Sequence, residues 1–177
     1  WLGSIGEGLV KFNPIFTFYN IQNGLLSNYI NAVYENNQGE IFVGINGGFN
    51  IIEKNNSIKT FQTLKELGFS SVYHINEFKN ELLLGTNNGL FKLLGDKTKP
   101  IPFSDKEIKD ENIYHTYRHK NNFYVGGKTG FYVLEDDTLH SVLNSPKEFV
   151  YNIVEYKGSI YLASNKGIYK YDGKTFE

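Results

Sequence analysis

Two of the four histidines come closest to a reactive group in type and spacing. His74 and His115 occupy the same position in two copies of an internal repeat, and Asn152 stands there in a later copy. Imidazoles and an amide on a common wall could hydrogen-bond a sugar, or each could instead bond the backbone of a neighbouring repeat. His115 and His119 are about 13 Å apart if they lie on one strand, too far to share a metal ion. We therefore expect no metal site.

Other catalytic signatures are missing or weak. The chain has no cysteine, which excludes disulfides, thiolate metal sites and cysteine nucleophiles. It has no GxSxG, P-loop, HExxH or EF-hand motif. Residues 44–48 and 126–130 resemble glycine-rich phosphate loops, but no helix follows them, so we interpret them as hairpins. The acidic pairs Asp110 with Glu111 and Asp136 with Asp137 fall in predicted loops, where we expect solvated turn residues. The segment is thus predicted to be no enzyme and to need no cofactor.

Composition excludes two classes of partner. The formal net charge is −1, so no bulk field attracts nucleic acid. No apolar run approaches the roughly 18–20 residues of a membrane-spanning helix. The chain begins at Trp1 rather than Met, which suggests an interior piece of a longer protein.

Five copies of one pattern follow each other at a period of about 40 residues, typical of a β-propeller. Each copy reads as an apolar strand, Gly or Ala, a polar turn, Gly and a second apolar strand. The second glycine falls at Gly8, Gly48, Gly89, Gly130 and Gly167. Alternating apolar residues and Asn, Gly, Asp or Lys turns divide each copy into four antiparallel strands.

The repeat predicts an all-β fold, an arc of four-stranded antiparallel blades. The expected innermost strands are Ile30–Glu35, Val72–Phe78, Ile113–His119 and Val150–Tyr156. The blades would span 1–20 (partial), 21–63, 64–104, 105–144 and 145–177 (partial); only 64–67 could form a helical turn. The first copy lacks its innermost strand and the last lacks its fourth. Since the ends overlap rather than complement each other, we expect an open arc cut from a larger propeller. His74, His115 and Asn152 would then face its channel.

Residues 16–52 resemble the two-component regulator propeller repeat. The positions that match its pattern are Gly24, Leu25, Ser27, Asn28, Ile30, Val33, Glu35, Gly39, Ile41, Phe42, Val43, Gly44 and Gly48. Trp1 matches the repeat's signature tryptophan. The match weakens from Leu64 onward, where the period alone carries the assignment.

The resemblance implies a function that the residues alone do not. Such repeats form the extracytoplasmic sensor of hybrid histidine kinases in Gram-negative bacteria, and many respond to oligosaccharides. It implies a place in the periplasm or at the cell surface, with the kinase outside the present chain. Expected partners are an oligosaccharide and the remainder of the propeller and parent receptor, with a homodimer left open. One alternative is a cell-surface or secretion-accessory scaffold for protein interactions. Another is a glycan-cleaving enzyme, which needs two acids roughly 5–10 Å apart, a pair that the sequence does not indicate.

One face of the predicted propeller is the better place for a ligand. Loops entering the innermost strand and loops joining strands two and three emerge there. They carry amides, ammonium groups and an aromatic ring that suit sugar hydroxyls and pyranose faces, although Asn is also simply a good turn former. The candidates are Asn28, Tyr29, Asn46, Asn87, Asn88, Lys128, Asn165 and Lys166. The other face has tight hairpin turns, such as Gln38 with Gly39, and is expected to offer little shape for recognition.

Overall fold

The part of the chain that the structure describes forms five antiparallel sheets with little helix. The computed structural model describes residues 2–4, 6, 8–11, 17–62 and 68–177. The first sheet joins β1 (Leu2–Ser4), β2 (Gly8–Lys11) and β3 (Thr17–Tyr19). The last joins β16 (Val150–Tyr156), β17 (Ser159–Ser164) and β18 (Gly167–Tyr171). The helical element of the described residues is one short 3-10 turn, Ile21–Asn23.

Three four-stranded sheets lie between these two. The second sheet contains β4 (Ile30–Glu35), β5 (Ile41–Ile45), β6 (Gly48–Ile52) and β7 (Ile58–Gln62). The third contains β8 (Val72–Phe78), β9 (Glu81–Thr86), β10 (Gly89–Leu94) and β11 (Lys97–Pro100). The fourth contains β12 (Ile113–His119), β13 (Asn122–Gly127), β14 (Phe131–Glu135) and β15 (Thr138–Ser141).

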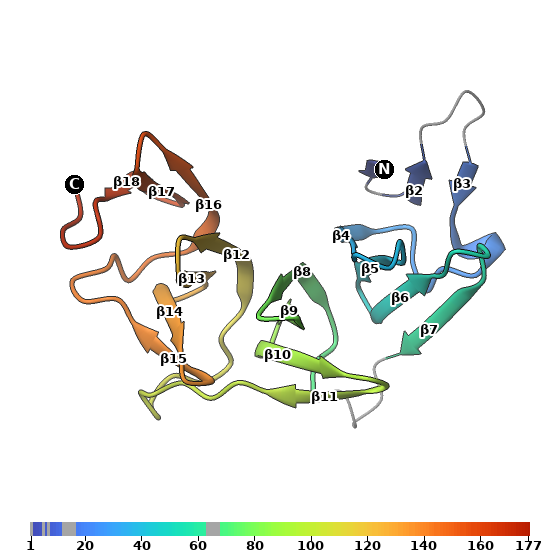
Figure 1. The fold of residues 1–177 in the computed structure, drawn as a ribbon, viewed down its shortest axis with the longest axis horizontal. Coiled ribbons are helices and arrows are strands. Elements are labelled where there is room, and N and C mark those ends of the chain that lie inside the picture. Colours follow the sequence, from blue (N-terminus) through green and yellow to red (C-terminus); the bar gives the residue numbers. More distant parts are fainter. Residues whose placement is uncertain (1, 5, 7, 12–16, 63–67) are drawn as a thin grey trace.

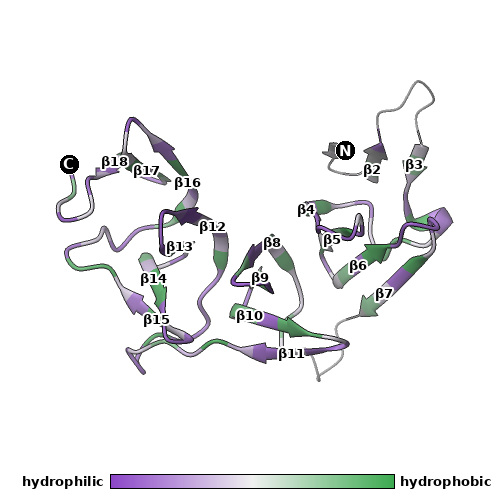
Figure 2. Cartoon of the chain, viewed as in Figure 1, coloured by the Kyte–Doolittle hydropathy of each residue, from purple (hydrophilic) through white to green (hydrophobic). Residues whose placement is uncertain are grey.

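The sheets follow one another along an open arc, with β4, β8, β12 and β16 on its inner side (Figure 1). The predicted fold class is therefore confirmed, and the four predicted innermost strands have the expected bounds. The outer strand β7 carries both hydrophilic and hydrophobic residues (Figure 2), whereas every residue of the middle strands β5 and β6 is buried, because both faces of a middle strand pack against neighbouring sheets. The expected helical turn at 64–67 and the signature Trp1 lie outside the described residues.

The apolar core lies between neighbouring sheets. In one such layer, Phe42 and Phe49 of the second sheet pack with Val72, Ile75 and Leu84 of the third. The next layers repeat this arrangement along the arc. Because each sheet buries its faces against its neighbours, the inner strands are held at fixed positions across consecutive blades.

In each of the first four sheets, a glycine in the strand next to the innermost position makes this close packing possible. A Cβ on Gly44 would lie 3.0 Å from the Val72 carbonyl oxygen, and one on Gly126 would lie 2.8 Å from that of Val150. A Cβ on Gly85 would likewise lie 3.0 Å from the Ile113 carbonyl oxygen, and one on Gly3 would lie 2.9 Å from the Ile30 side chain. The glycine therefore allows one blade's backbone to reach the next, whereas the last sheet has Ala163 at this position, and that residue is exposed.

A buried lysine links two blades at their outer edge. Lys92 of β10 is 6% exposed, and its Nζ lies 2.5 Å from Glu81 Oε2 and 2.6 Å from Asp137 Oδ1 of the next blade. Lys92 draws the Asp137 pKa below its ordinary value, chiefly through this hydrogen bond. The sequence predicts Asp137 to be a solvated turn residue. Its side chain is indeed 63% exposed, but it also forms this inter-blade contact.

Lys92→Ala is expected to lower the free energy of unfolding by about 1–2 kcal/mol, since it removes two charge-assisted hydrogen bonds and a packed stem while the carboxylates stay near solvent. Urea denaturation measures the change. The control is Lys59→Ala, which breaks the exposed Lys59–Asp96 pair and should leave the midpoint nearly unchanged. Equal effects of the two variants would contradict the role of Lys92.

Candidate functional site

The channel-facing candidates lie along one groove on the inner side of the arc. Its volume is about 620 Å³, and three strands each contribute three consecutive residues, 74–76 from β8, 115–117 from β12 and 152–154 from β16. His74, His115 and Asn152 are all among them. None of the residues that line the groove in the described part of the chain is an acid, a lysine or an arginine. The groove therefore offers neutral hydrogen-bonding groups beside apolar side chains.

The two histidines are in ring contact and are held neutral. Their ring centroids are 4.3 Å apart, at an angle of 48°. Burial lowers the pKa of His74 to about 3, with a further contribution from His115, while a hydrogen bond to the Thr116 backbone opposes the shift. Burial also lowers the pKa of His115 to about 4. Both imidazoles are thus uncharged at neutral pH, and each can donate and accept a hydrogen bond.

Two polar atoms of the groove residues are unsatisfied. His115 Nδ1 and Thr116 Oγ1 are buried and have no hydrogen-bond partner within the described part of the chain. Such atoms are uncommon in folded proteins because an unpaired buried polar group is costly. Both belong to residues that line the groove, but the two atoms themselves are closed to solvent.

Side-chain hydrogen bonds hold the loops on the face of the propeller that carries the predicted ligand candidates. We call each set of these bonds a clamp. Asn87 Oδ1 accepts bonds of 2.8 Å from the amides of both Ser70 and Ser71. Asn165 Oδ1 accepts from the Phe149 amide at 3.2 Å. Each clamp ties the turn between the second and third strands to the segment that enters the innermost strand of the same blade.

In the blade between them, Glu111 forms the clamp. Its Oε1 accepts a 2.8 Å bond from the Thr129 amide, and its Oε2 accepts a 2.6 Å bond from Thr129 Oγ1. Glu111 is 1% exposed, and burial raises its pKa although the Thr129 bonds oppose this shift. The expectation of a solvated turn residue is therefore wrong for Glu111. A lone acidic residue in a loop carries no local sign that a turn 18 residues later will cover it.

The remaining candidates on this face differ in their interactions: some are hydrogen-bonded, one forms an ion pair and two are exposed. Asn28 Oδ1 accepts from the Ile21 amide, Asn46 Oδ1 from Asn31 Nδ2, and the Gly68 carbonyl from Asn88 Nδ2. Lys166 forms an ion pair with Glu148 at 2.8 Å. Tyr29 and Lys128 are exposed. Contact of these residues with a ligand stays a prediction.

Sequence reasoning missed a row of aromatic side chains beside the groove. Tyr73, Tyr114 and Tyr151 directly precede the channel-facing candidates on β8, β12 and β16. Adjacent ring centroids are 5.6 Å and 5.5 Å apart. Three tyrosines at one repeat position are visible in the sequence and were the available signal.

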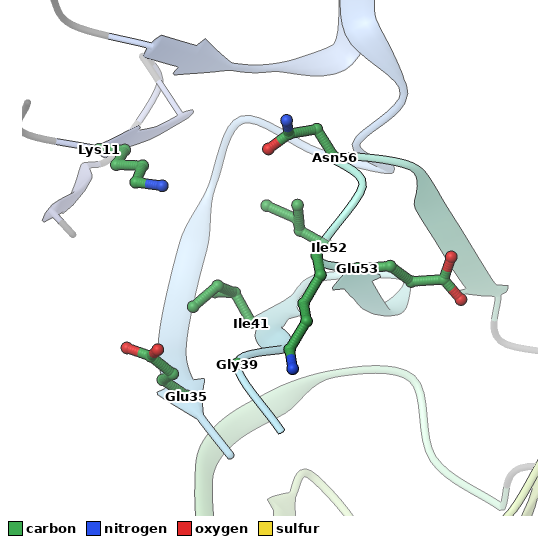
Figure 3. Close-up of a pocket in the computed structure, with 8 residues that line it drawn as sticks. Lys11, Glu35, Gly39, Ile41, Ile52, Glu53 and Asn56 are labelled. Atoms are coloured by element: carbon green, nitrogen blue, oxygen red, sulfur yellow. The ribbon is translucent and has the colours of Figure 1, made fainter. Parts of the chain in front are cut away.

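The opposite face, which carries the tight hairpin turns, has a hollow. A hollow of about 230 Å³ lies between the first two sheets, where Lys11, Glu35, Gly39 and Asn56 are among its lining residues (Figure 3). It mixes both signs of charge. The tight turn at Gly39 thus borders a hollow, contrary to the expectation that this face offers little shape.

Among the described residues, no group of three or more histidine, cysteine or acidic side chains converges as metal ligands would. Within the same residues no helix has both the length and the hydrophobicity to cross a membrane.

Comparison with known proteins shows which solved structures share the fold of this chain. No family model and no curated protein sequence matches the chain. Among solved structures, the extracellular domain of the hybrid two-component system BT3049 from B. thetaiotaomicron aligns over 100% of this chain and 26% of its own, with a TM-score of 0.80 and 18% identity. That of BT4673 from the same organism aligns over 97% of this chain and 25% of its own, with a TM-score of 0.79 and 13% identity. The chain thus has the fold of a segment of these domains and spans about a quarter of their length.

A more distant likeness involves a secretion component. PorZ, a surface component of the type-IX secretion system of Porphyromonas gingivalis, aligns over 96% of this chain and 36% of its own, with a TM-score of 0.51 and 10% identity. At these identities the comparisons establish a propeller arc, and function rests on the site.

Proposed function

We propose that the chain is the ligand-sensing segment of an extracytoplasmic propeller in a hybrid two-component receptor, and that its ligand is an oligosaccharide. The observation that carries the proposal is the groove on β8, β12 and β16, in which neutral polar side chains from three blades meet. Supporting it is the structural likeness to two extracellular domains of hybrid two-component systems. In this proposal the segment lies in the periplasm or at the surface of a Gram-negative cell.

The chemistry of the groove fits a sugar better than an ion. Imidazole, amide and hydroxyl groups can pair with sugar hydroxyls, and the exposed side chain of Val154 can contact the apolar face of a sugar ring. The clamped loops limit the ordering cost of binding because the backbone around the site is already held. The groove brings no pair of carboxyl groups together, so the proposed role is recognition without hydrolysis.

Neutral oligosaccharides are expected to bind with an affinity that changes little when salt is raised from about 0.05 to 0.5 M, because no charge pairing drives binding. Isothermal titration calorimetry with cello-, malto- and xylo-oligosaccharides measures this. Asn152→Ala should weaken binding, since Asn152 is exposed in the groove and its loss should not disturb folding.

The matched control is Asn121→Ala, which removes an exposed amide in a hairpin turn of the opposite face. It should bind as the unaltered protein does. Binding restricted to acidic saccharides, with a steep loss of affinity in salt, would refute the proposed ligand class.

A second candidate is a cell-surface scaffold for protein interactions. The fold is shared with PorZ, a surface component of the type-IX secretion system. Pull-down from cell-envelope extracts with this chain as bait tests the scaffold role. A specific protein partner, together with no saccharide binding, would favour the scaffold.

A further inference from the structure

A β-bulge recurs at the start of each innermost strand. On β8, Val72 pairs with Thr86 and His74 pairs with Gly85, so Tyr73 is the extra residue. Tyr114 on β12 and Tyr151 on β16 are the extra residues of the same irregularity. The bulge changes which side chains share a face of the strand.

The effect is clearest on β8. Val72 and Ile75 belong to one buried cluster although they are three residues apart, which a regular strand would not allow. The extra residue therefore leaves two consecutive side chains, Tyr73 and His74, outside that cluster. The same holds on β16, where Val150 and Ile153 share a cluster and Tyr151 and Asn152 do not.

The three tyrosines form a continuous row across three blades. Besides the two contacts between neighbouring tyrosines, Phe149 lies 5.9 Å from Tyr151 with nearly parallel rings, and 6.3 Å from Tyr114. Tyr151 is 49% exposed, while Tyr73 and Tyr114 are half-buried. Asn112 Nδ2 donates a 3.0 Å bond to the Tyr114 hydroxyl.

The bulge itself does not require an aromatic residue. On β4, where the same irregularity occurs, the extra residue is Asn31. The aromatic rings at the other three positions thus need a reason beyond backbone geometry. They also lie one residue from His74, His115 and Asn152, on the strands that form the groove.

We propose that Tyr73, Tyr114 and Tyr151 are the stacking platform of the site, on which a neutral oligosaccharide lies across β8, β12 and β16 with at least three consecutive sugar rings. This inference rests on the proposed function and names the contacts of the same site. Stacking on the row sets the direction of the chain. The groove beside it supplies hydrogen bonds from His74, His115 and Asn152.

Two measurements test the platform by calorimetry, with cello-, malto- and xylo-oligosaccharides of two to six rings as probes. Affinity should rise from two rings to three or more. Tyr151→Ala should weaken binding of the longer chains about tenfold, because a ring contact is lost, while Tyr151→Phe should keep most of the affinity. Tyr151 is half exposed, so its replacement should leave the thermal midpoint nearly unchanged.

The control is Tyr156→Ala, on the same strand and 58% exposed, but outside the row. It should bind normally. If the unaltered protein binds a saccharide but Tyr73→Ala and Tyr151→Ala bind equally well, or if two rings bind as tightly as six, the platform is refuted while the sensor role stands. If no saccharide binds the unaltered protein, both proposals fall.

Discussion

Lowering the pH from 7 to 5 is expected to reduce the free energy of unfolding by about 3 kcal/mol, because His74 and His115 resist protonation in the folded state. Their folded pKa values are about 3 and about 4, against 6.5 for the ordinary side chain. Below pH 6.5 the unfolded chain therefore binds more protons than the folded chain. Stability is fully present above that pH and is lost as the pH falls towards 4.

Urea denaturation at several pH values measures this dependence. The double variant His74→Gln with His115→Gln keeps polar, uncharged groups in the groove and should flatten the profile between pH 7 and 5. Glu111 contributes with the opposite sign, since its raised pKa favours the folded state as the pH falls towards its ordinary value near 4.5. It is present in both proteins, so the difference between them isolates the histidines. A profile equally steep in the double variant would contradict the assignment.

Gly126→Ala is expected to lower the free energy of unfolding by about 2–3 kcal/mol, because the new methyl group would overlap the next blade. Its Cβ would lie 2.7 Å from Val150 Cγ1 and 2.8 Å from the Val150 carbonyl oxygen. The carbonyl belongs to the backbone of β16, so relief requires moving the whole blade. Chemical denaturation of the purified variant measures the loss.

Gly130→Ala is the matched control for this change. The residue lies beside the same sheet, and its Cβ would meet nothing closer than 3.6 Å. Neither glycine has the left-handed backbone that strains an alanine, so the comparison isolates the inter-blade contact. Equal destabilisation by both substitutions would show that close packing of the blades is not the cause.

The repeat made the architecture predictable. The alternation of apolar residues, the turn residues and the period of about 40 residues are local signals, and they locate the innermost strands and the fold class. Register between copies also identifies His74, His115 and Asn152 as equivalent positions. That equivalence holds in space because each blade packs on the next with the same geometry.

Other features depend on contacts that no local signal contains. The clamps by Asn87, Asn165 and Glu111, and the link from Lys92 to Asp137, join segments separated in the chain by 16 to 45 residues. An Asn in a turn looks the same whether its oxygen meets water or a neighbouring loop. For this reason residue type alone proposes the face candidates, whereas the structure shows several of them already hydrogen-bonded within the chain.

The sequence by itself determined the strands, the turns and the stacking of repeats, since these follow from side-chain periodicity and backbone preferences within one copy. Only the tertiary structure decided which side chains share a surface. The bulge at Tyr73, Tyr114 and Tyr151 adds one residue to each inner strand and so reverses the faces that simple alternation assigns. The ring contact between His74 and His115 likewise arises between blades, because the two imidazoles belong to neighbouring copies of the repeat.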